Sequence, residues 1–206
     1  MLKIIALITF LGVSQSGNAG QADTLTELQQ QWARIKYNTP ADQQEALFKQ
    51  LSESSEAVLN ANPDQAPYMI WHGIILSTYA GAKGGLGALS LVKEAKSLFE
   101  ASIENNPYAL NGSAYTSLGT LYYQVPGWPI GFGDEDKARE NLRQALKINP
   151  DGIDSNYFYG DFLMDQGERD DAVKVLNHAL AAEPRQGREL ADKGRRAEIQ
   201  ALLQTQ

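Results

Sequence analysis

Residues 153–186 read IDSNYFYGDFLMDQGERDDAVKVLNHALAAEPRQ, and this stretch decides the fold. Gly160 and Ala172 are small residues, 12 positions apart, which would let two helices approach closely. Gly167 lies between them at a turn, and Pro184 ends the second helix. The stretch therefore predicts two antiparallel helices joined by a short turn, which is a helical hairpin.

The preceding segments repeat this pattern with extra residues. Residues 145–150, ALKINP, end an earlier hairpin 34 residues before the matching proline, which is the period of a tetratricopeptide repeat. The pair of small residues in that hairpin is Gly119 and Ala138, with seven additional residues between them. One hairpin earlier the pair is Gly73 and Ala95, with ten additional residues. Both inserts fall at the turn of a hairpin.

The sequence thus predicts an all-α fold of tetratricopeptide-like helical hairpins stacked as a short superhelix. About four hairpins and a C-terminal capping helix over residues 193–203 make up a single domain, residues 23–206. Two inter-helix loop inserts are expected, the glycine-rich AGAKGGLGALS at 80–90 and VPGWPIGFGD at 125–134.

The N-terminal residues 1–22 have the pattern of a cleaved signal peptide. Lys3 precedes the apolar run 4–13, and small residues follow, with cleavage expected after Ala19 or Ala22. We therefore expect a periplasmic protein. The chain has no cysteine, so neither lipidation nor a disulfide is expected. No later apolar run approaches 18 residues, so no membrane span is expected.

The charge balance and the missing motifs narrow the function. A formal net charge of -7 argues against nucleic acid as a partner. The C-terminal Arg185, Arg188, Arg195 and Arg196 are interpreted as a solvated helix face.

Catalytic and metal-binding patterns are missing too. The sequence contains no Gly-x-Ser-x-Gly motif and no cysteine nucleophile. The glycine-rich 80–90 lacks the order of a phosphate-binding loop, and Asp134 is better explained as a helix cap than as a calcium ligand. His72 and His178 have no histidine or carboxylate partner one turn away. We expect no enzyme, cofactor or metal.

Two runs carry a resemblance to a known family, YTSLGTLYYQVPGWPIGFGDEDKA at 115–138 and NPDGIDSNYFYGDFL at 149–163. They are similar to tetratricopeptide-like exported bacterial proteins related to the T component of tripartite ATP-independent periplasmic (TRAP) transporters. The resemblance covers roughly residues 60–200. It implies a periplasmic partner of a solute-binding protein, with a groove or pore for an apolar or organic-acid ligand. Many such proteins are lipid-anchored, and this chain lacks the necessary cysteine.

The first helix of each hairpin is expected to line a concave face. Relative to the marker glycine, the inner positions lie three residues before, one after and four after it. They are Ile70, Ile74, Ser77, Thr116, Thr120, Tyr123, Tyr157, Asp161 and Met164. Such a groove suits an extended peptide, a helix or an amphipathic organic ligand. Alternatively, some of these side chains pack against neighbouring helices.

The insert at 125–134 holds Trp128 and Phe132 between prolines and glycines. Large apolar side chains in a loop favour an ordered flap that folds over the groove and buries Trp128. An interface with another chain and an internal plug remain as alternatives. We therefore predict a non-enzymatic binding protein for a protein partner or small organic ligand. The alternative is a scaffold for cell-envelope assembly. The sequence leaves homo-oligomer formation open.

Overall fold

The computed structural model describes residues 16–204. Within that range the chain forms nine α-helices and one short 3-10 helix, which confirms the predicted all-α class. In order they are α1 (Ser16–Asn38), α2 (Ala41–Ala61), α3 (Ala66–Lys83), α4 (Gly85–Asn105), η1 (Ala109–Gly112), α5 (Ser113–Gln124), α6 (Glu135–Ile148), α7 (Ile153–Asp165), α8 (Arg169–Leu180) and α9 (Glu189–Gln204).

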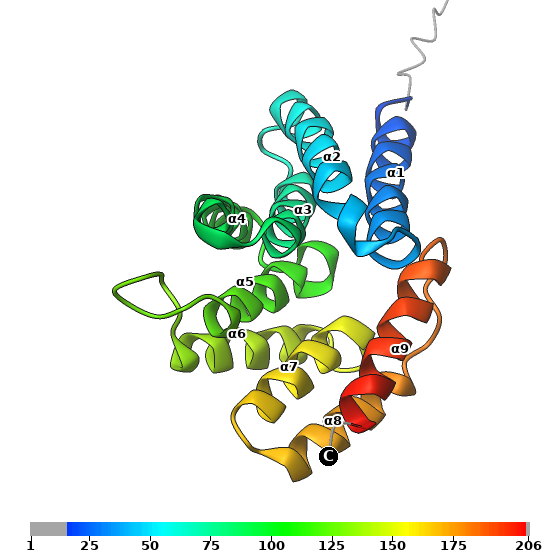
Figure 1. The fold of residues 1–206 in the computed structure, drawn as a ribbon. Helices are drawn as coiled ribbons and strands as arrows, with labels where there is room; N and C mark the ends of the chain where they lie inside the picture. Colours follow the sequence, from blue (N-terminus) through cyan, green and yellow to red (C-terminus); the bar gives the residue numbers. More distant parts are fainter. Residues whose placement is uncertain (1–15, 205–206) are drawn as a thin grey trace, which may run out of the picture.

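The helices pair as consecutive antiparallel hairpins, α1 with α2, α3 with α4, α5 with α6 and α7 with α8 (Figure 1). The odd-numbered helices contact one another in sequence, so they form the inner layer of the stack. The even-numbered helices pack on its outside. At the end of the stack α9 contacts α7 and α8 and also α1, so the stack curves into a closed ring.

The three marker glycines lie at close helix contacts, as the repeat pattern predicts. A Cβ atom added to Gly73, Gly119 or Gly160 would lie 2.6, 2.8 and 2.6 Å, respectively, from a side-chain atom of the paired helix. The side chains that occupy this space are Phe99, Leu142 and Leu176. Any larger residue would push the two helices of the hairpin apart, which explains the small residue in each repeat.

Apolar side chains fill the space between the layers in three clusters. The central cluster lies between α3 and α8, and includes Phe99, Leu142 and Phe162. A second cluster joins α1, α2 and α3 to α9. The third joins α7 and α8 to α9 through the fully buried Ile199. The last helix therefore shares a core with both ends of the stack.

The glycine-rich insert differs from the prediction. It is not an inter-helix loop, because α3 continues to Lys83 and α4 begins at Gly85. Gly84 and Gly85, with φ angles of 65° and 63°, make the turn between them. The ten extra residues lengthen both helices of this hairpin. Ala80 and Leu89 pack on the central cluster, so tertiary burial outweighs the low helix propensity of glycine.

The predicted signal peptide falls mostly on residues that the structure does not describe. Residues 1–15 lie outside the described residues, and α1 begins at Ser16, before the expected cleavage sites. Cleavage, export and a domain that starts at residue 23 therefore stay predictions.

Candidate functional site

Several of the predicted concave positions belong to the core. Ile70 is fully buried in the central cluster, and Thr116 and Thr120 are buried too. The Thr120 hydroxyl donates to the carbonyl of Thr116, one turn earlier in α5, at 2.8 Å. These three side chains pack between helices, as the alternative interpretation stated.

The other predicted positions are half-buried and largely satisfied within the chain. The Tyr123 hydroxyl donates to Asp161 at 2.6 Å. Ser77 donates to the carbonyl of Gly73 at 2.8 Å. Ile74, Tyr157 and Met164 pack at the edges of the apolar clusters. Binding of a ligand by these residues stays a prediction.

Two surface hollows lie elsewhere. One, of about 370 Å³, lies between α1 and α2, and one of about 410 Å³ lies beside α9. No predicted binding residue lines either hollow.

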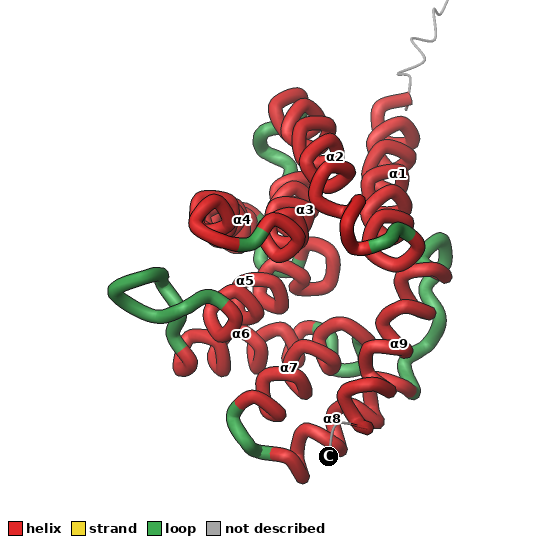
Figure 2. The backbone as a smooth tube through the Cα atoms, viewed as in Figure 1, coloured by secondary structure: helices red, strands yellow, loops and turns green. Residues whose placement is uncertain are grey.

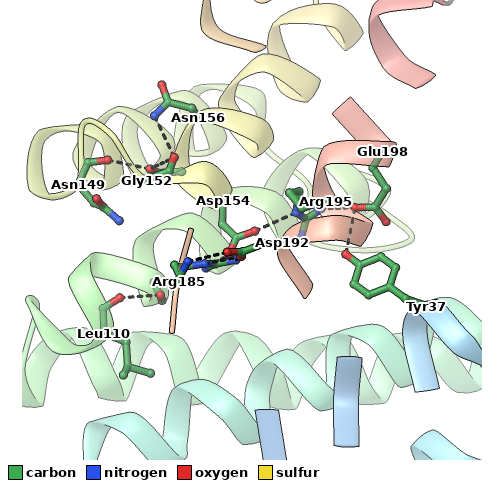
Figure 3. A network of polar contacts seen from close by, with 12 residues as sticks. Tyr37, Leu110, Asn149, Gly152, Asp154, Asn156, Arg185, Asp192, Arg195 and Glu198 are labelled. Carbon is green, nitrogen blue, oxygen red and sulfur yellow. Dashed lines mark hydrogen bonds and ion pairs between the residues drawn. The ribbon is translucent and has the colours of Figure 1, made fainter. Parts of the chain in front are cut away.

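A network of charged groups joins α9 and the loop before it to the start of α7 and the end of α1 (Figure 3). Asp154, at the start of α7, accepts from Arg195 at 2.8 Å and from Arg185 at 2.7 Å. Arg185 also bonds Asp192 at 2.7 Å, and Arg195 bonds Glu198 at 2.6 Å. Helices α7 and α9 and the loop before α9 are thus tied together by paired charges.

The network corrects the interpretation of the C-terminal arginines as a solvated face. Arg195 is only 7% exposed, and its guanidinium lies 4.1 Å from the ring centre of Tyr157 and 4.6 Å from that of Phe158. Arg196 donates to the carbonyls of Leu180 and Ala182. The helical spacing carried a signal, because Arg195 lies on the same face of α9 as the buried Ala191 and Ile199.

The two arginines that contact Asp154 stabilise its ionised form. Burial alone would raise the pKa of Asp154, but Arg195 and Arg185 outweigh it and hold that pKa well below its usual range. Burial raises the pKa of the Tyr37 hydroxyl, which donates to Glu198 at 3.2 Å. Asp154 therefore stays ionised at neutral pH, and Tyr37 stays protonated.

The insert between α5 and α6 carries the most exposed large apolar side chain among the residues whose burial the structure describes. We call residues 126–133 the finger, which is the long loop between those helices in Figure 2. Trp128 is 90% exposed and Ile130 is 67% exposed. The prediction that Trp128 is buried beneath a flap is therefore wrong. The finger projects outward from the stack, away from α9 and the inner face of the ring (Figure 1).

The finger is held in place by its own backbone. The amide of Gly133 donates to Pro126 at 3.0 Å, and the amides of Ile130 and Gly131 donate to Gly127 at 3.1 Å. A Cβ atom on Gly131 or Gly133 would overlap the carbonyls of the opposite strand of the loop, so only glycine fits there. These contacts fix the backbone so that Trp128 and Ile130 point away from the helices. The sequence alone could not show this direction.

Phe132 is the one large apolar residue of the finger that packs inward. Its ring meets Tyr122 edge-on at 5.9 Å, with Lys96 over its face at 5.8 Å. Asp134 caps α6 by accepting from the amide of Lys137 at 3.0 Å, as expected. The finger is therefore anchored at its base while its tip stays in solvent.

A buried histidine has neighbours that superficially resemble a catalytic triad. The Ser55 hydroxyl lies 2.8 Å from Nδ1 of His72, and Glu94 lies 3.8 Å from Nε2. Ser55 is only 1% exposed, and it bonds the carbonyl of Ser52. A substrate cannot reach this hydroxyl, so the contacts order the α2–α3–α4 core rather than form a reaction centre.

His72 makes folding sensitive to mild acid. Burial lowers its pKa, although Glu94 and Glu56 oppose that shift. Below about pH 6.5 the unfolded chain therefore takes up a proton that the folded protein resists, and the free energy of unfolding falls with pH, by at most about 1.4 kcal/mol per unit. We expect His72→Gln to remove this slope and the exposed His178→Gln to keep it. Urea unfolding between pH 7 and 5 measures both, and an equal slope in all three proteins would contradict the assignment.

The described part of the chain contains neither a cluster of metal ligands nor a helix suited to span a membrane. Over residues 16–204, histidine, aspartate and glutamate side chains form no group of three that could hold a metal ion. In the same range, no helix combines the length and apolar character needed to cross a bilayer.

Comparison with known proteins shows which fold the chain resembles. Residues 130–203 match the family model of the tetratricopeptide repeat. The crystal structure of a thermophilic TPR protein from Thermus thermophilus is similar with a TM-score of 0.54 and 22% sequence identity. The alignment covers 89% of this chain and 83% of that one. No curated protein matches the chain. At this identity the similarity is one of fold, and the chain is tetratricopeptide-like.

Proposed function

We propose that this protein is a non-catalytic interaction scaffold that binds a protein partner through the tip of the finger. The observation that carries the proposal is the 90% exposure of Trp128 on a loop whose conformation is fixed. Tetratricopeptide folds commonly mediate protein–protein interaction and are typically non-catalytic. Because the tip of the finger is exposed and does not cover a groove, it favours the scaffold hypothesis over the small-ligand groove.

The physical argument rests on the cost of exposing a large apolar side chain. A tryptophan and an isoleucine held in water lose the free energy that burial would supply, about 1.5–3 kcal/mol for a large apolar side chain. The chain nevertheless uses two obligatory glycines and several backbone hydrogen bonds to hold them there. An ordered tip also loses little conformational entropy on binding, and tryptophan is the residue most enriched in binding hot spots.

The setting of this interaction is also part of the proposal. The charge, apolar run and small residues of the first 22 positions support export to the periplasm without a lipid anchor. The resemblance of 115–138, which includes the finger, supports a partner among the components of periplasmic solute transport.

Photo-cross-linking tests the proposal. A photoreactive amino acid at position 128 should cross-link a defined partner in the native host. With the partner purified, Trp128→Ala should weaken binding by about 2 kcal/mol, or roughly thirtyfold in Kd. The control is Tyr108→Ala, an aromatic residue that is 70% exposed outside the finger. Both variants should keep the melting temperature of the wild type because both side chains lie in solvent.

Isothermal titration calorimetry gives the dissociation constants. Equal affinity for the wild type and Trp128→Ala would contradict the proposal. So would a large fall in the melting temperature of Trp128→Ala, because it would mean that the tryptophan is part of the core.

A further inference from the structure

The first hairpin is packed more loosely than the other three. Helices α1 and α2 pack less extensively against each other than the two helices of any later hairpin. In the later hairpins a glycine of one helix receives a large side chain of the other, as Gly73 receives Phe99. Residues 21–72, which include most of α1 and all of α2, contain no glycine, so this hairpin lacks such a contact. The hollow of about 370 Å³ lies in the space that remains between the two helices.

This hollow combines apolar side chains with a polar rim. Leu51 is buried, and Ile35 and Leu47 are half-buried along its lining. Exposed polar side chains surround them, among them Arg34, Gln50 and Ser54. The other hollow, beside α9, is lined mostly by charged and polar side chains. A large apolar side chain therefore fits the hollow between α1 and α2 better than the one beside α9.

The finger has the shape and the chemistry that this hollow can accept. Trp128 is 90% exposed, so it does not occupy the hollow of its own chain. Residues 126–133 carry no charged side chain, so the tip would bring no charge against the apolar lining. Hydrogen bonds within the loop already fix its backbone, so docking would cost little additional conformational entropy.

Charges beside the two surfaces are complementary. Arg34 is exposed and forms no ion pair within residues 16–204. An arginine over the face of an aromatic ring is favourable, and tryptophan gives the strongest contact of this kind. The exposed Glu135 and Asp136 follow the finger directly at the start of α6. This local attraction opposes the repulsion between two chains that each carry a formal net charge of -7.

We propose that Trp128 of one copy inserts into the hollow between α1 and α2 of a second copy. The proposal rests on the proposed function, in which the finger is a docking element, and it names a second copy as the occupant of the hollow. The finger lies on the third hairpin and the hollow on the first, so the contact is heterologous and copies join head to tail. A partner protein that binds the finger would compete with the second copy.

The small size of the tip makes this contact weak. A tryptophan side chain buries about 150–250 Å². The tip as a whole therefore buries less than the roughly 1,200 Å² at which stable interfaces begin. Copies should associate reversibly, and the mean mass should rise above that of a single chain at roughly 0.1–1 mM protein.

Analytical ultracentrifugation of the purified chain over that concentration range tests the proposal. Trp128→Ala and Arg34→Glu should each weaken self-association at least about tenfold. Ser54→Trp should abolish it, because the new side chain fills the hollow. Arg169→Glu is the matched control, since it reverses an exposed charge on α8, outside the hollow, and it should associate like the wild type. All four variants should keep the wild-type melting temperature, because all four positions are exposed.

A mixture of two variants distinguishes head-to-tail contact from other modes of association. Ser54→Trp keeps its finger but has a blocked hollow, whereas Trp128→Ala keeps its hollow but lacks the tip. Each alone should be a monomer, and the equimolar mixture should form a one-to-one dimer and nothing larger. Self-association retained by Ser54→Trp would overturn the proposal, because it would show that the hollow is not the docking site. A mixture that stays monomeric would overturn it as well.

Photo-cross-linking of the purified protein gives a result that does not depend on the folding of any hollow variant. A photoreactive phenylalanine derivative at position 128 should cross-link to residues 31–54 of a second copy. Cross-links that map elsewhere on the second copy would overturn the proposal. A wild-type chain that stays monomeric but binds a host protein through Trp128 would overturn this proposal alone. Self-association through Trp128 without any host partner would overturn only the proposed function.

Discussion

Replacing Phe99 with alanine is expected to lower the free energy of unfolding by about 3–5 kcal/mol. Phe99 is fully buried in the central cluster, where its ring fills the space left by Gly73 in the paired helix. The surrounding helices are fixed by their own neighbours, so they cannot collapse fully into the cavity. Urea unfolding monitored by circular dichroism measures the loss. The exposed Tyr108→Ala should stay within about 0.5 kcal/mol of the wild type.

A double-mutant cycle with Gly73 tests the contact itself. In the wild type a Cβ atom at position 73 would lie 2.6 Å from Phe99, so Gly73→Ala should destabilise the protein. In the Phe99→Ala background the same methyl group has room, and alanine is the better helix former by about 1 kcal/mol. Gly73→Ala should therefore become neutral or stabilising. Additive effects of the two changes would show that α3 and α4 do not approach as closely as the repeat requires.

The hairpins could be predicted from the sequence because close helix contact leaves a local mark. Gly119 and Ala138 face each other across one hairpin, and each must be small for the same steric reason. That requirement survives insertions between the two helices, so the repeat could be aligned through both inserts. The sequence did not show that the first insert is helical, because the burial of Ala80 and Leu89 depends on neighbouring hairpins.

The finger shows a different limit. Its composition indicated an ordered loop with apolar side chains, and this much is confirmed. The direction of Trp128 depends on the backbone path between Gly127 and Gly133, which meet across the loop. A path of this kind is set by hydrogen bonds and steric contacts within the loop, not by the spacing of apolar residues. The sequence could therefore identify the residues of the candidate site without placing them.

Closure of the ring could not be predicted either. The contact between Tyr37 and Gly194 joins residues at opposite ends of the chain. It depends on small rotations that accumulate from one hairpin to the next, and no single repeat encodes their sum. The sequence also made Arg195 look like a surface residue, because its partners lie on another helix. Its partner Asp154 lies 41 residues earlier, at the start of α7, and the pairing depends on how α9 packs on the last hairpin.

Replacing Arg195 with alanine is expected to lower the free energy of unfolding by about 3–5 kcal/mol, comparable to the loss of a core aromatic ring. The change removes a buried cation and leaves Asp154 and Glu198 each without this partner at the centre of the network. Arg195 also covers the rings of Tyr157 and Phe158, so part of the loss is lost packing.

Arg195→Met separates charge from packing, because methionine keeps apolar volume over the two rings without the guanidinium. If packing dominates, Arg195→Met should recover most of the loss. If charge dominates, the free energy of unfolding of Arg195→Met should resemble that of Arg195→Ala.

The pH dependence of the free energy of unfolding separates the two cases further. Since Arg195 and Arg185 hold the pKa of Asp154 below its unfolded value, their stabilising effect is complete above about pH 4 and is lost as pH falls further. The free energies of unfolding of the wild type and Arg195→Ala should therefore become more similar as the pH is lowered. A difference that stays constant from pH 6 to pH 3, in urea unfolding at each pH, would show that Arg195 stabilises the ring through its contacts with the aromatic rings and not through Asp154.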